Sequence, residues 1–477
     1  MMLNTGFRLI YLLGIVLMTT MVSAQDMSGW SDKTVCRLLE QHGKDEFVNE
    51  ADSRGLNCAD PIQITERKFV AYKNSRKTPI TLYTSLYGEA YNYGSDYRTE
   101  LPEHPNPAPN KATLQTYLDR YIDEPRAFRG FKVSASDSPY KFTHKLKDDE
   151  YVKQHIRKTS LLSYLLYEQG AIVVDEITPE FQFGTQVNNQ TPLPSRSLGK
   201  TFTSYLLGHA ICEGYIDGLD SRMNDWPKVE DTVYQDQKLI DLVNMRAGDQ
   251  KYAHTNQVFL PKQIGVRHQS VFKHLSSLKG SKPSKRFYNY NDLVVNTVTN
   301  YIDYKTGYQY QEFVSDFLRN KIGIGENVYF LSADRMSVSP SGIPSNGAYI
   351  SNYSASRYDF LRIARSMLDD WQNDTCEGKY LKEIHKKRMR KDNPDSNFQK
   401  SLREHKFPNK SYNSYAGYFH TDLYKVPKTR SIMAMDGFGG QMIVIDFDLG
   451  RIVVTNSIYN DYNWKRIVRD VIANGKP

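Results

Sequence analysis

The sequence predicts an α/β (α+β) fold: an antiparallel sheet flanked by helices, with an inserted, mostly helical lobe and a small N-terminal extension. Strand-like runs open the main region at residues 160–177 and close it at residues 431–457, whereas helical periodicities fill the chain between them. Strands from both ends of the region can share one sheet, which makes the helical stretch an insertion. A site between the sheet and the helical lobe is then the natural place for chemistry.

Length and composition favour a large globular protein. The chain has 477 residues, of which 39% are hydrophobic and 24% charged, and this length predicts one large two-lobed domain plus extensions. The net charge of +8 is spread among matched acidic residues, and no basic stripe with interleaved aromatic residues is present. Nucleic acid is therefore not an expected partner. The oligomeric state cannot be deduced from these numbers.

The first residues have the pattern of an export signal. Arg8 precedes an apolar run at residues 9–21, and Val22-Ser23-Ala24 forms a small-x-small cleavage site. We predict a signal peptide over residues 1–24, cleavage between Ala24 and Gln25, and a periplasmic or secreted mature protein. The apolar run is too short for a comfortable membrane span, so no stable membrane anchor is expected after cleavage, although an uncleaved anchor is the alternative.

Export permits disulfide bonds, and the chain has four cysteines. Cys36 and Cys58 bracket a predicted helical hairpin, residues 25–60, whose two halves meet at Gly43. A bond between them would close a short loop and contribute roughly 3 kcal/mol. Cys212 is expected to be free and buried within a helix, and Cys376 lies in a polar loop. No zinc-ligand spacing occurs, so no metal site is predicted.

The chain then divides into an extension and a main domain. Residues 61–145 are polar, rich in tyrosine and interrupted by proline, and we expect an N-terminal extension of unknown function beside the main domain. The main domain spans residues 146–477. It begins with two strands at 160–177, joined by a turn at Gln169-Gly170.

The strongest chemical motif follows these strands, at Ser197-Leu-Gly-Lys200. A turn-forming cluster precedes Ser197, and apolar residues then recur at helical spacing up to Tyr215, so Ser197 is expected at a helix N-terminus with Lys200 on the same face. A lysine one turn away can accept a serine proton when it is neutral, and the N–H groups of the helix end can stabilise an oxyanion. Three other S-x-x-K matches, at Ser138, Ser270 and Ser276, lack this context.

Further helices complete the inserted lobe and the end of the chain. Amphipathic patterns predict a helix at 237–250 ending at a glycine, a tyrosine-rich entry to a helix at 285–302, and a helix at 352–371. Residues 376–430 are basic and rich in loops. Strands at 431–457 and a closing helix at 464–473 follow.

Residues 160–477 resemble the serine β-lactamase and penicillin-binding-protein superfamily. The similarity is to the class C-like branch, which includes esterases, D-amino-acid peptidases and aminohexanoate-oligomer hydrolases. Three motifs of that superfamily have counterparts here in the same order. They are Ser197–Lys200, Tyr290-Asn291-Asp292, and Met435-Asp436-Gly437 at the position of a Lys/His-x-Gly strand motif. The segments 239–248 and 346–368 also resemble sequences of this branch.

The chain departs from the family pattern at two of these positions. Asp292 replaces the usual asparagine. Met435 stands where a lysine or histidine reads a substrate carboxylate, and methionine cannot donate a hydrogen bond. β-Lactams and peptidoglycan stem peptides carry that carboxylate, so activity on them is not expected. Ester or amide cleavage on another acyl donor is unaffected by the change.

The resemblance implies roles for seven residues. Ser197 would be the nucleophile, Lys200 would take its proton or tune the pair, and Tyr290 would carry protons to the leaving group and from water. Tyr288, two residues earlier, is the alternative to Tyr290. The backbone N–H groups of Ser197 and Phe438 are oxyanion-hole candidates. Gly437, Asp292 and Asp436 complete the candidate substrate-binding residues.

The predicted activity is therefore that of an exported serine hydrolase acting on a small-molecule ester or amide, without metal or cofactor. Two alternatives remain open. A catalytically silent binding protein could keep this fold, as the altered third motif and the long N-terminal extension suggest. An acyltransferase could use the same serine and pass the acyl group to an amine or alcohol instead of water.

Overall fold

A computed structural model describes most of the chain. The described residues are 27–58, 114, 118, 130–253, 271–332, 349–391 and 412–476. The predicted signal peptide, most of the predicted N-terminal extension at residues 61–145, and residues 392–411 of the basic, loop-rich region lie outside them. Within the described residues, no helix combines the length and the apolar character that crossing a bilayer requires.

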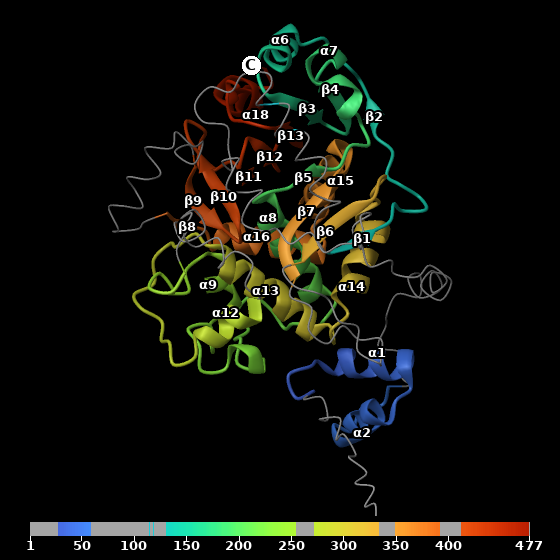
Figure 1. The fold of residues 1–477 in the computed structure, drawn as a ribbon, viewed down its shortest axis with the longest axis vertical. Coiled ribbons are helices and arrows are strands. Elements are labelled where there is room, and N and C mark those ends of the chain that lie inside the picture. Colours follow the sequence, from blue (N-terminus) through green and yellow to red (C-terminus); the bar gives the residue numbers. More distant parts are fainter. Residues whose placement is uncertain are drawn as a thin grey trace, which may run out of the picture.

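A nine-stranded sheet forms the centre of the main domain (Figure 1). Its spatial order is β2-β4-β3-β13-β12-β11-β10-β9-β8, and every neighbouring pair except β2–β4 is antiparallel. The strands are β2 (Thr143–His144), β3 (Leu161–Glu168), β4 (Ala171–Ile177), β8 (Met389–Arg390), β9 (Tyr412–Ala416), β10 (Phe419–Leu423), β11 (Ile432–Gly437), β12 (Gln441–Asp446) and β13 (Arg451–Ser457).

The pairing of β3 with β13 joins the N-terminal and C-terminal strands of the domain in one sheet. Arg451 lies opposite Glu168, and their side chains form an ion pair at the strand ends. The predicted turn between β3 and β4 is present, with Gly170 at φ 89°, a conformation that glycine adopts without strain. The sheet assembled from distant segments, predicted from the sequence, is therefore confirmed.

Helices cover both faces of the large sheet. On one face, α6 packs on β3 and β4, and α18 packs on β12 and β13 (Figure 1). On the other face, α15 packs on β12 and β13, α8 packs on β11 and β12, and α16 lies against both helices. Each face thus has its own apolar core. The helices are α6 (Glu150–Lys158), α7 (Glu180–Phe183), α8 (Leu198–Cys212), α15 (Arg357–Gln372), α16 (Cys376–Lys386), the π-helical η6 (Lys465–Asp470) and α18 (Val471–Asn474).

The inserted lobe lies below the large sheet in Figure 1 and includes a second, four-stranded sheet. That sheet has the order β1-β6-β7-β5, with β1 (Gly130–Val133), β5 (Leu193–Pro194), β6 (Val328–Ser332) and β7 (Tyr349–Ala355). Strands β1 and β2 both precede residue 146, so the two sheets extend beyond the predicted domain boundary. The lobe's helical elements are η2 (Pro227–Val229), α9 (Leu239–Val243), α12 (Val271–Ser277), α13 (Asp292–Lys305), α14 (Tyr310–Asp316) and η4 (Phe317–Ile322), whereas η1 (Gly184–Gln186) directly follows α7.

One predicted helix is shorter than expected. Of residues 237–250, only α9 is helical, because Met245 adopts a left-handed conformation with φ 56° and ends the helix before the predicted glycine. The turn that follows brings this segment against residues 284–291. Sequence periodicity alone could not predict this early end, since Met245 is an ordinary helix former.

The N-terminal hairpin has the predicted form. It consists of α1 (Asp32–His42) and α2 (Asp45–Ser53), joined at Gly43 with φ 57°, and a Cys36–Cys58 disulfide connects α1 to the end of the hairpin. The hairpin packs on the end of α13, where Trp30 contacts the rings of Tyr304 and Tyr308. The predicted disulfide is therefore present.

The prediction that Cys212 is free is wrong. Cys212 forms a disulfide with Cys376, and their Cα atoms are 5.7 Å apart. The reason is the packing of α8 on α16: Cys212 is the last residue of α8 and Cys376 the first of α16, so the two helix ends meet although 164 residues separate them. No local pattern in the sequence reports such a distant contact.

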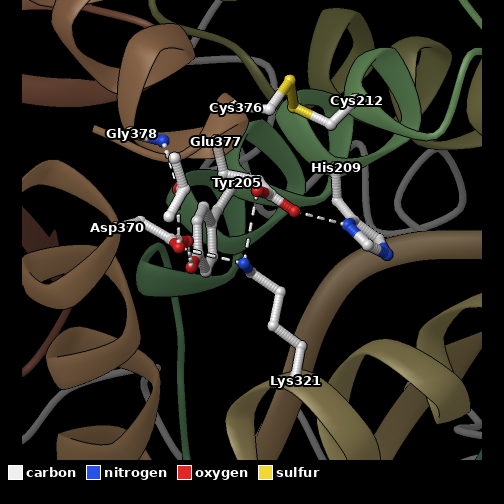
Figure 2. The surroundings of a disulfide bond; sticks show 9 residues. Tyr205, His209, Cys212, Lys321, Asp370, Cys376, Glu377 and Gly378 are labelled. Atoms are coloured by element: carbon white, nitrogen blue, oxygen red, sulfur yellow. Dashed lines mark hydrogen bonds and ion pairs between the residues drawn. A yellow bond between two sulfur atoms is a disulfide. The ribbon is translucent and has the colours of Figure 1, made fainter. Parts of the chain in front are cut away.

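A network of charged side chains lies beside this second disulfide (Figure 2). Lys321 is 3.0 Å from a carboxylate oxygen of Asp370 and 3.2 Å from one of Glu377, and Glu377 is 2.8 Å from Nδ1 of His209. The network and the disulfide join α8, α15 and α16 at the end of α8 opposite Ser197. They fix the axis of the helix that presents the nucleophile.

Candidate active site

The turn that presents Ser197 is held by the small sheet. Ser195 Oγ accepts a hydrogen bond from the N–H of Tyr353, and the N–H of Ser195 donates to the Tyr353 carbonyl at 2.7 Å. Arg196 follows in the left-handed region at φ 51°, which is uncommon for a residue with a side chain. This bend reverses the chain direction, so that Ser197 caps α8 as predicted.

Ser197 and Lys200 are in direct contact. Lys200 Nζ donates a hydrogen bond to Ser197 Oγ at 2.9 Å, and the Lys200 side chain is 5% exposed. Gly199 allows this helix end to approach β7, because a Cβ atom at that position would lie 1.8 Å from the Ser351 carbonyl oxygen. Ser197 and Lys200 therefore lie at a helix N-terminus that packs closely against the backbone of β7.

The loop before α13 brings Tyr290 to this pair. The Tyr290 hydroxyl is hydrogen-bonded with both Ser197 and Lys200, and the Lys200 ammonium lies 4.9 Å from the centre of the Tyr290 ring. Tyr288 is instead buried in the core, with its ring centre 5.0 Å from that of Tyr415. Of the two tyrosines between which the sequence could not decide, Tyr290 is the one that meets the serine.

Asp292 is the fourth member of the cluster. One of its carboxylate oxygens lies 2.6 Å from Lys200 Nζ, and its side chain is 46% exposed. Burial lowers the pKa of Lys200, but the charges of Asp292 and Tyr290 and the hydrogen bonds from both oppose this effect, and the net result is a pKa above the usual range. Lys200 is therefore a stable cation in the resting protein.

The charge on Lys200 determines which group can accept the serine proton. A protonated lysine has no lone pair to offer and can only donate to Ser197 Oγ. Burial raises the pKa of Tyr290, the neighbouring Lys200 cation and the Ser197 hydrogen bond act against this increase, and the net pKa lies above its usual range. The arrangement supplies an oriented serine hydroxyl, a phenol, and a cation that favours the ionised form of that phenol.

Strand β11 carries the counterpart of the third motif and borders the nucleophile turn. Met435 is buried at 1% exposure among the core residues that face α8. A Cβ atom on Gly437 would lie 2.6 Å from Leu198 Cδ1 and 2.9 Å from the Ser195 carbonyl oxygen, so glycine permits the close approach. Phe438 follows directly after β11, and its part in an oxyanion hole stays a prediction.

Asp436 belongs to a charged group that the sequence did not reveal. Burial raises the pKa of Asp436 to about 7, and the Lys391 ammonium opposes the increase. Burial likewise lowers the pKa of Lys391 to about 7. Lys391 Nζ lies 2.6 Å from His420 Nδ1. Thus a lysine does lie near the third motif, but it directly follows β8 and interacts electrostatically with Asp436.

Other contributors to the site are Asp249, Asn289 and Asn291, which surround the Tyr290 loop. Sequence reasoning missed Asp249 because it lies 40 residues from Asn289 along the chain. Its only sequence signal is its place directly after a segment that resembles the branch. In the described part of the chain, no group of three or more His, Cys, Asp or Glu side chains is arranged to hold a metal ion.

Comparison with solved structures identifies the fold. A protein from Bacillus anthracis described as a 6-aminohexanoate-dimer hydrolase superposes with a TM-score of 0.54 at 15% sequence identity, over 79% of this chain and 95% of that one. The chain therefore has the β-lactamase/transpeptidase fold, and the predicted resemblance is confirmed as a likeness of structure.

Two further matches have lower scores. A penicillin-binding protein from Bacillus halodurans gives a TM-score of 0.47 at 11% identity, over 68% of this chain and 99% of that one. A class C β-lactamase from Rhodobacter sphaeroides gives 0.41 at 16% identity, over 66% and 94%. By sequence, no family model and no curated protein matches the chain.

Proposed function

We propose that this protein is a serine hydrolase that cleaves an ester or amide through an acyl-enzyme on Ser197. The observation that carries the proposal is the contact of Ser197 Oγ with buried Lys200 at 2.9 Å, with Tyr290 completing the cluster. A serine, a lysine and a tyrosine that share hydrogen bonds suffice for acyl transfer. The fold shared with a protein described as a 6-aminohexanoate-dimer hydrolase supports the same class of reaction.

In this reaction, Ser197 Oγ attacks the substrate carbonyl in the molecules in which Tyr290 is ionised, and its proton passes to that phenolate oxygen. The Lys200 cation stabilises that phenolate and stays protonated, which its ion pair with Asp292 favours. Tyr290 then returns the proton to the leaving group as the acyl-enzyme forms. In the second half, Tyr290 takes a proton from water, and the resulting hydroxide attacks the acyl carbonyl. Tyr290 then returns the proton to Ser197 Oγ as the acid product leaves, which restores both groups.

The substrate is proposed to lack a carboxylate beside the scissile bond. Met435 supplies no hydrogen-bond donor, and Lys391 interacts electrostatically with Asp436 and lies 2.6 Å from His420 Nδ1. A substrate carboxylate beside this motif would lie near the Asp436 carboxyl group, and an unpaired buried charge is costly. Neutral esters and amides fit these surroundings better.

The site of action is proposed to be the periplasm or the outside of the cell. The two disulfides, Cys36–Cys58 and Cys212–Cys376, support an oxidising compartment. The predicted signal sequence at residues 1–24 supports export, and sequencing the N-terminus of the mature protein would check cleavage before Gln25.

The proposal is tested by replacing the nucleophile. Ser197→Ala should abolish turnover of a nitrophenyl ester while leaving the melting temperature within a few degrees of the original. Ser138→Ala, which alters another S-x-x-K match, should keep full activity and serves as the control. A wild-type protein without turnover would favour the silent binding protein, and product analysis with an added amine would identify an acyltransferase.

A further inference from the structure

A buried carboxylate in the inserted lobe holds the loop that carries Tyr290. Asp249 is 1% exposed and lies in the turn after α9, where Gly248 has φ 73° and accepts a hydrogen bond from the N–H of Ser284 at 2.8 Å. A Cβ atom on Gly248 would lie 2.5 Å from the Ser284 carbonyl oxygen, so the two segments are in close backbone contact. The turn is therefore fixed against the segment that leads to Tyr290.

Asp249 binds the residues on both sides of Tyr290. Asn289 Nδ2 donates to one carboxylate oxygen at 2.8 Å, and Asn291 Nδ2 donates to the other at 3.1 Å. The Tyr234 hydroxyl also donates to that second oxygen, at 2.8 Å. Both asparagines and Tyr234 are buried as well. The carboxylate thus closes a ring of hydrogen bonds around the backbone of Tyr290.

Asn291 links this ring to the helix that follows. Its Oδ1 accepts a hydrogen bond from the N–H of Val294 and caps α13, while its Nδ2 reaches Asp249. One side chain therefore sets both the start of α13 and the position of the Tyr290 loop. Asp292, the partner of Lys200, is the first residue of that helix.

The hydrogen bonds of this ring require both side-chain oxygens of residue 249 to act as acceptors. A carboxylate can accept on each oxygen, whereas an amide has one acceptor and one donor end. In Asp249→Asn, either orientation of the new amide would turn its NH2 group toward the NH2 group of Asn289 or of Asn291. A buried ring with one such mismatch loses the geometry that it would otherwise enforce.

We propose that Asp249 is a positioning residue that keeps the Tyr290 hydroxyl in hydrogen-bonding reach of Ser197 and Lys200. It touches no reacting atom and acts through Asn289 and Asn291. This inference rests on the proposed function, since Tyr290 carries the proton in that reaction. A displacement of about 1 Å at a catalytic group is enough to reduce a rate by roughly a hundredfold.

The test is a reciprocal exchange of the two partners. Asp249→Asn should lower kcat for a nitrophenyl ester by at least about tenfold and change KM by less than about twofold, because the substrate is still bound but the proton carrier is displaced. The double variant Asp249→Asn with Asn291→Asp should recover part of kcat. In it, the new amide donates to a carboxylate at 291, which still caps α13 but loses the hydrogen bond that Asn291 Nδ2 donates to the Asn289 carbonyl at 3.0 Å.

Asp303→Asn is the matched control. Asp303 is equally buried, accepts a backbone hydrogen bond from Tyr310, and lies near the other end of α13, away from Tyr290. It should lower the melting temperature without lowering kcat at temperatures where it is folded. If Asp249→Asn does not fold, Asn291→Ser keeps the helix cap, loses the donor to Asp249, and should show the same fall in kcat.

The outcomes separate this inference from the proposed function. Full kcat in the folded Asp249→Asn variant, or in Asn291→Ser where it is used, would overturn the positioning role, as would a double variant that recovers nothing. An equal fall of kcat in Asp303→Asn would show that the fall in Asp249→Asn results from general destabilisation of the fold. A wild-type protein that neither turns over esters nor reacts at Ser197 would instead refute the proposed function, and the positioning role with it.

Discussion

The ion pair between Lys200 and Asp292 distinguishes this site from one with the usual asparagine. Asp292 holds the lysine protonated, and its charge also raises the pKa of Tyr290. Both effects oppose removal of the Ser197 proton near neutral pH, whether the acceptor is the phenolate or the lysine. The carboxylate therefore orients Lys200 at the expense of reactivity at low pH.

Replacing that carboxylate should make the enzyme more active near neutral pH. Asp292→Asn keeps an oxygen that can accept from Lys200 but removes the negative charge, so the pKa of Tyr290 and that of Lys200 should both fall. The rising limb of the pH–rate profile should move to lower pH, and kcat/KM at pH 7 should increase roughly threefold or more.

Asp236→Asn provides the control for this change in net charge. Asp236 is exposed, pairs with Arg222, and belongs to no part of the cluster. Its pH–rate profile should match that of the unaltered protein. A profile of Asp292→Asn that stays in place, or moves to higher pH, would show that Asp292 does not restrain the proton acceptor.

Met435 determines the expected substrate charge. The buried thioether offers a substrate carboxylate no donor, and the Asp436 carboxyl group lies beside it. A carboxylate without a partner costs several kcal/mol, and each 1.4 kcal/mol is about tenfold in rate or affinity. A nitrophenyl ester should therefore have a kcat/KM at least about a hundredfold above that of a chromogenic cephalosporin. Efficient cephalosporin hydrolysis by the same preparation would mean that another residue reads the carboxylate.

Single residues differ in how far the sequence could predict them. Ser197 and Lys200 are three residues apart on one helix, so local spacing was sufficient to place them together. Tyr290 needed the resemblance, and its choice over Tyr288 needed the structure, because both have aromatic neighbours in one short loop. Asp249 and Lys391 could not be predicted, since their partners are distant in the chain.

Among the elements, α8 is the one whose position the site depends on most. Its first residues approach β7, and its last residue is joined to α16 by the Cys212–Cys376 bond. The sequence predicted its start, from the turn before Ser197 and the helical periodicity after it. The disulfide at the end of α8 was not predicted, because the pairing of these cysteines depends on a contact between helices that are distant in the chain.

The pairing of Cys212 with Cys376 can be tested directly by counting thiols. Thiol counting on the denatured, unreduced protein should find no reactive thiol, because all four cysteines are paired. Removing the bond with Cys212→Ala and Cys376→Ala should lower the free energy of unfolding by about 2–4 kcal/mol. Cys36→Ala with Cys58→Ala is the matched control, and its shorter loop predicts a smaller loss. Two reactive thiols in the unaltered protein would contradict the pairing.

For the whole molecule, the sequence predicted the order of layers well. The strand-like runs at both ends of the domain predicted one shared sheet, and the helical periodicity between them predicted the inserted lobe. Both patterns could be used because hydrophobic periodicity reflects which side chains are buried. The small sheet was not foreseen. Its strands β1, β5, β6 and β7 are short or far apart in the chain, and β1 lies before the predicted domain boundary.

The large sheet, the four-stranded sheet and the helical part of the inserted lobe meet at Ser197. The small sheet holds Ser195 through Tyr353, the inserted lobe supplies Tyr290 and Asp292, and β11 of the large sheet packs on the nucleophile turn at Gly437. A site assembled from three parts of the fold around one serine supports a catalytic role for that serine. The central claim is that Ser197 forms a covalent intermediate.

Trapping with a fluorophosphonate, followed by peptide mass mapping, tests that claim most directly. The protein should gain one adduct, on the peptide that contains Ser197, and Ser197→Ala should gain none. Pre-incubation with a slowly hydrolysed ester should delay the labelling, because the substrate occupies the same hydroxyl. A label on any other residue, or no label on a folded protein that still hydrolyses esters, would contradict the account.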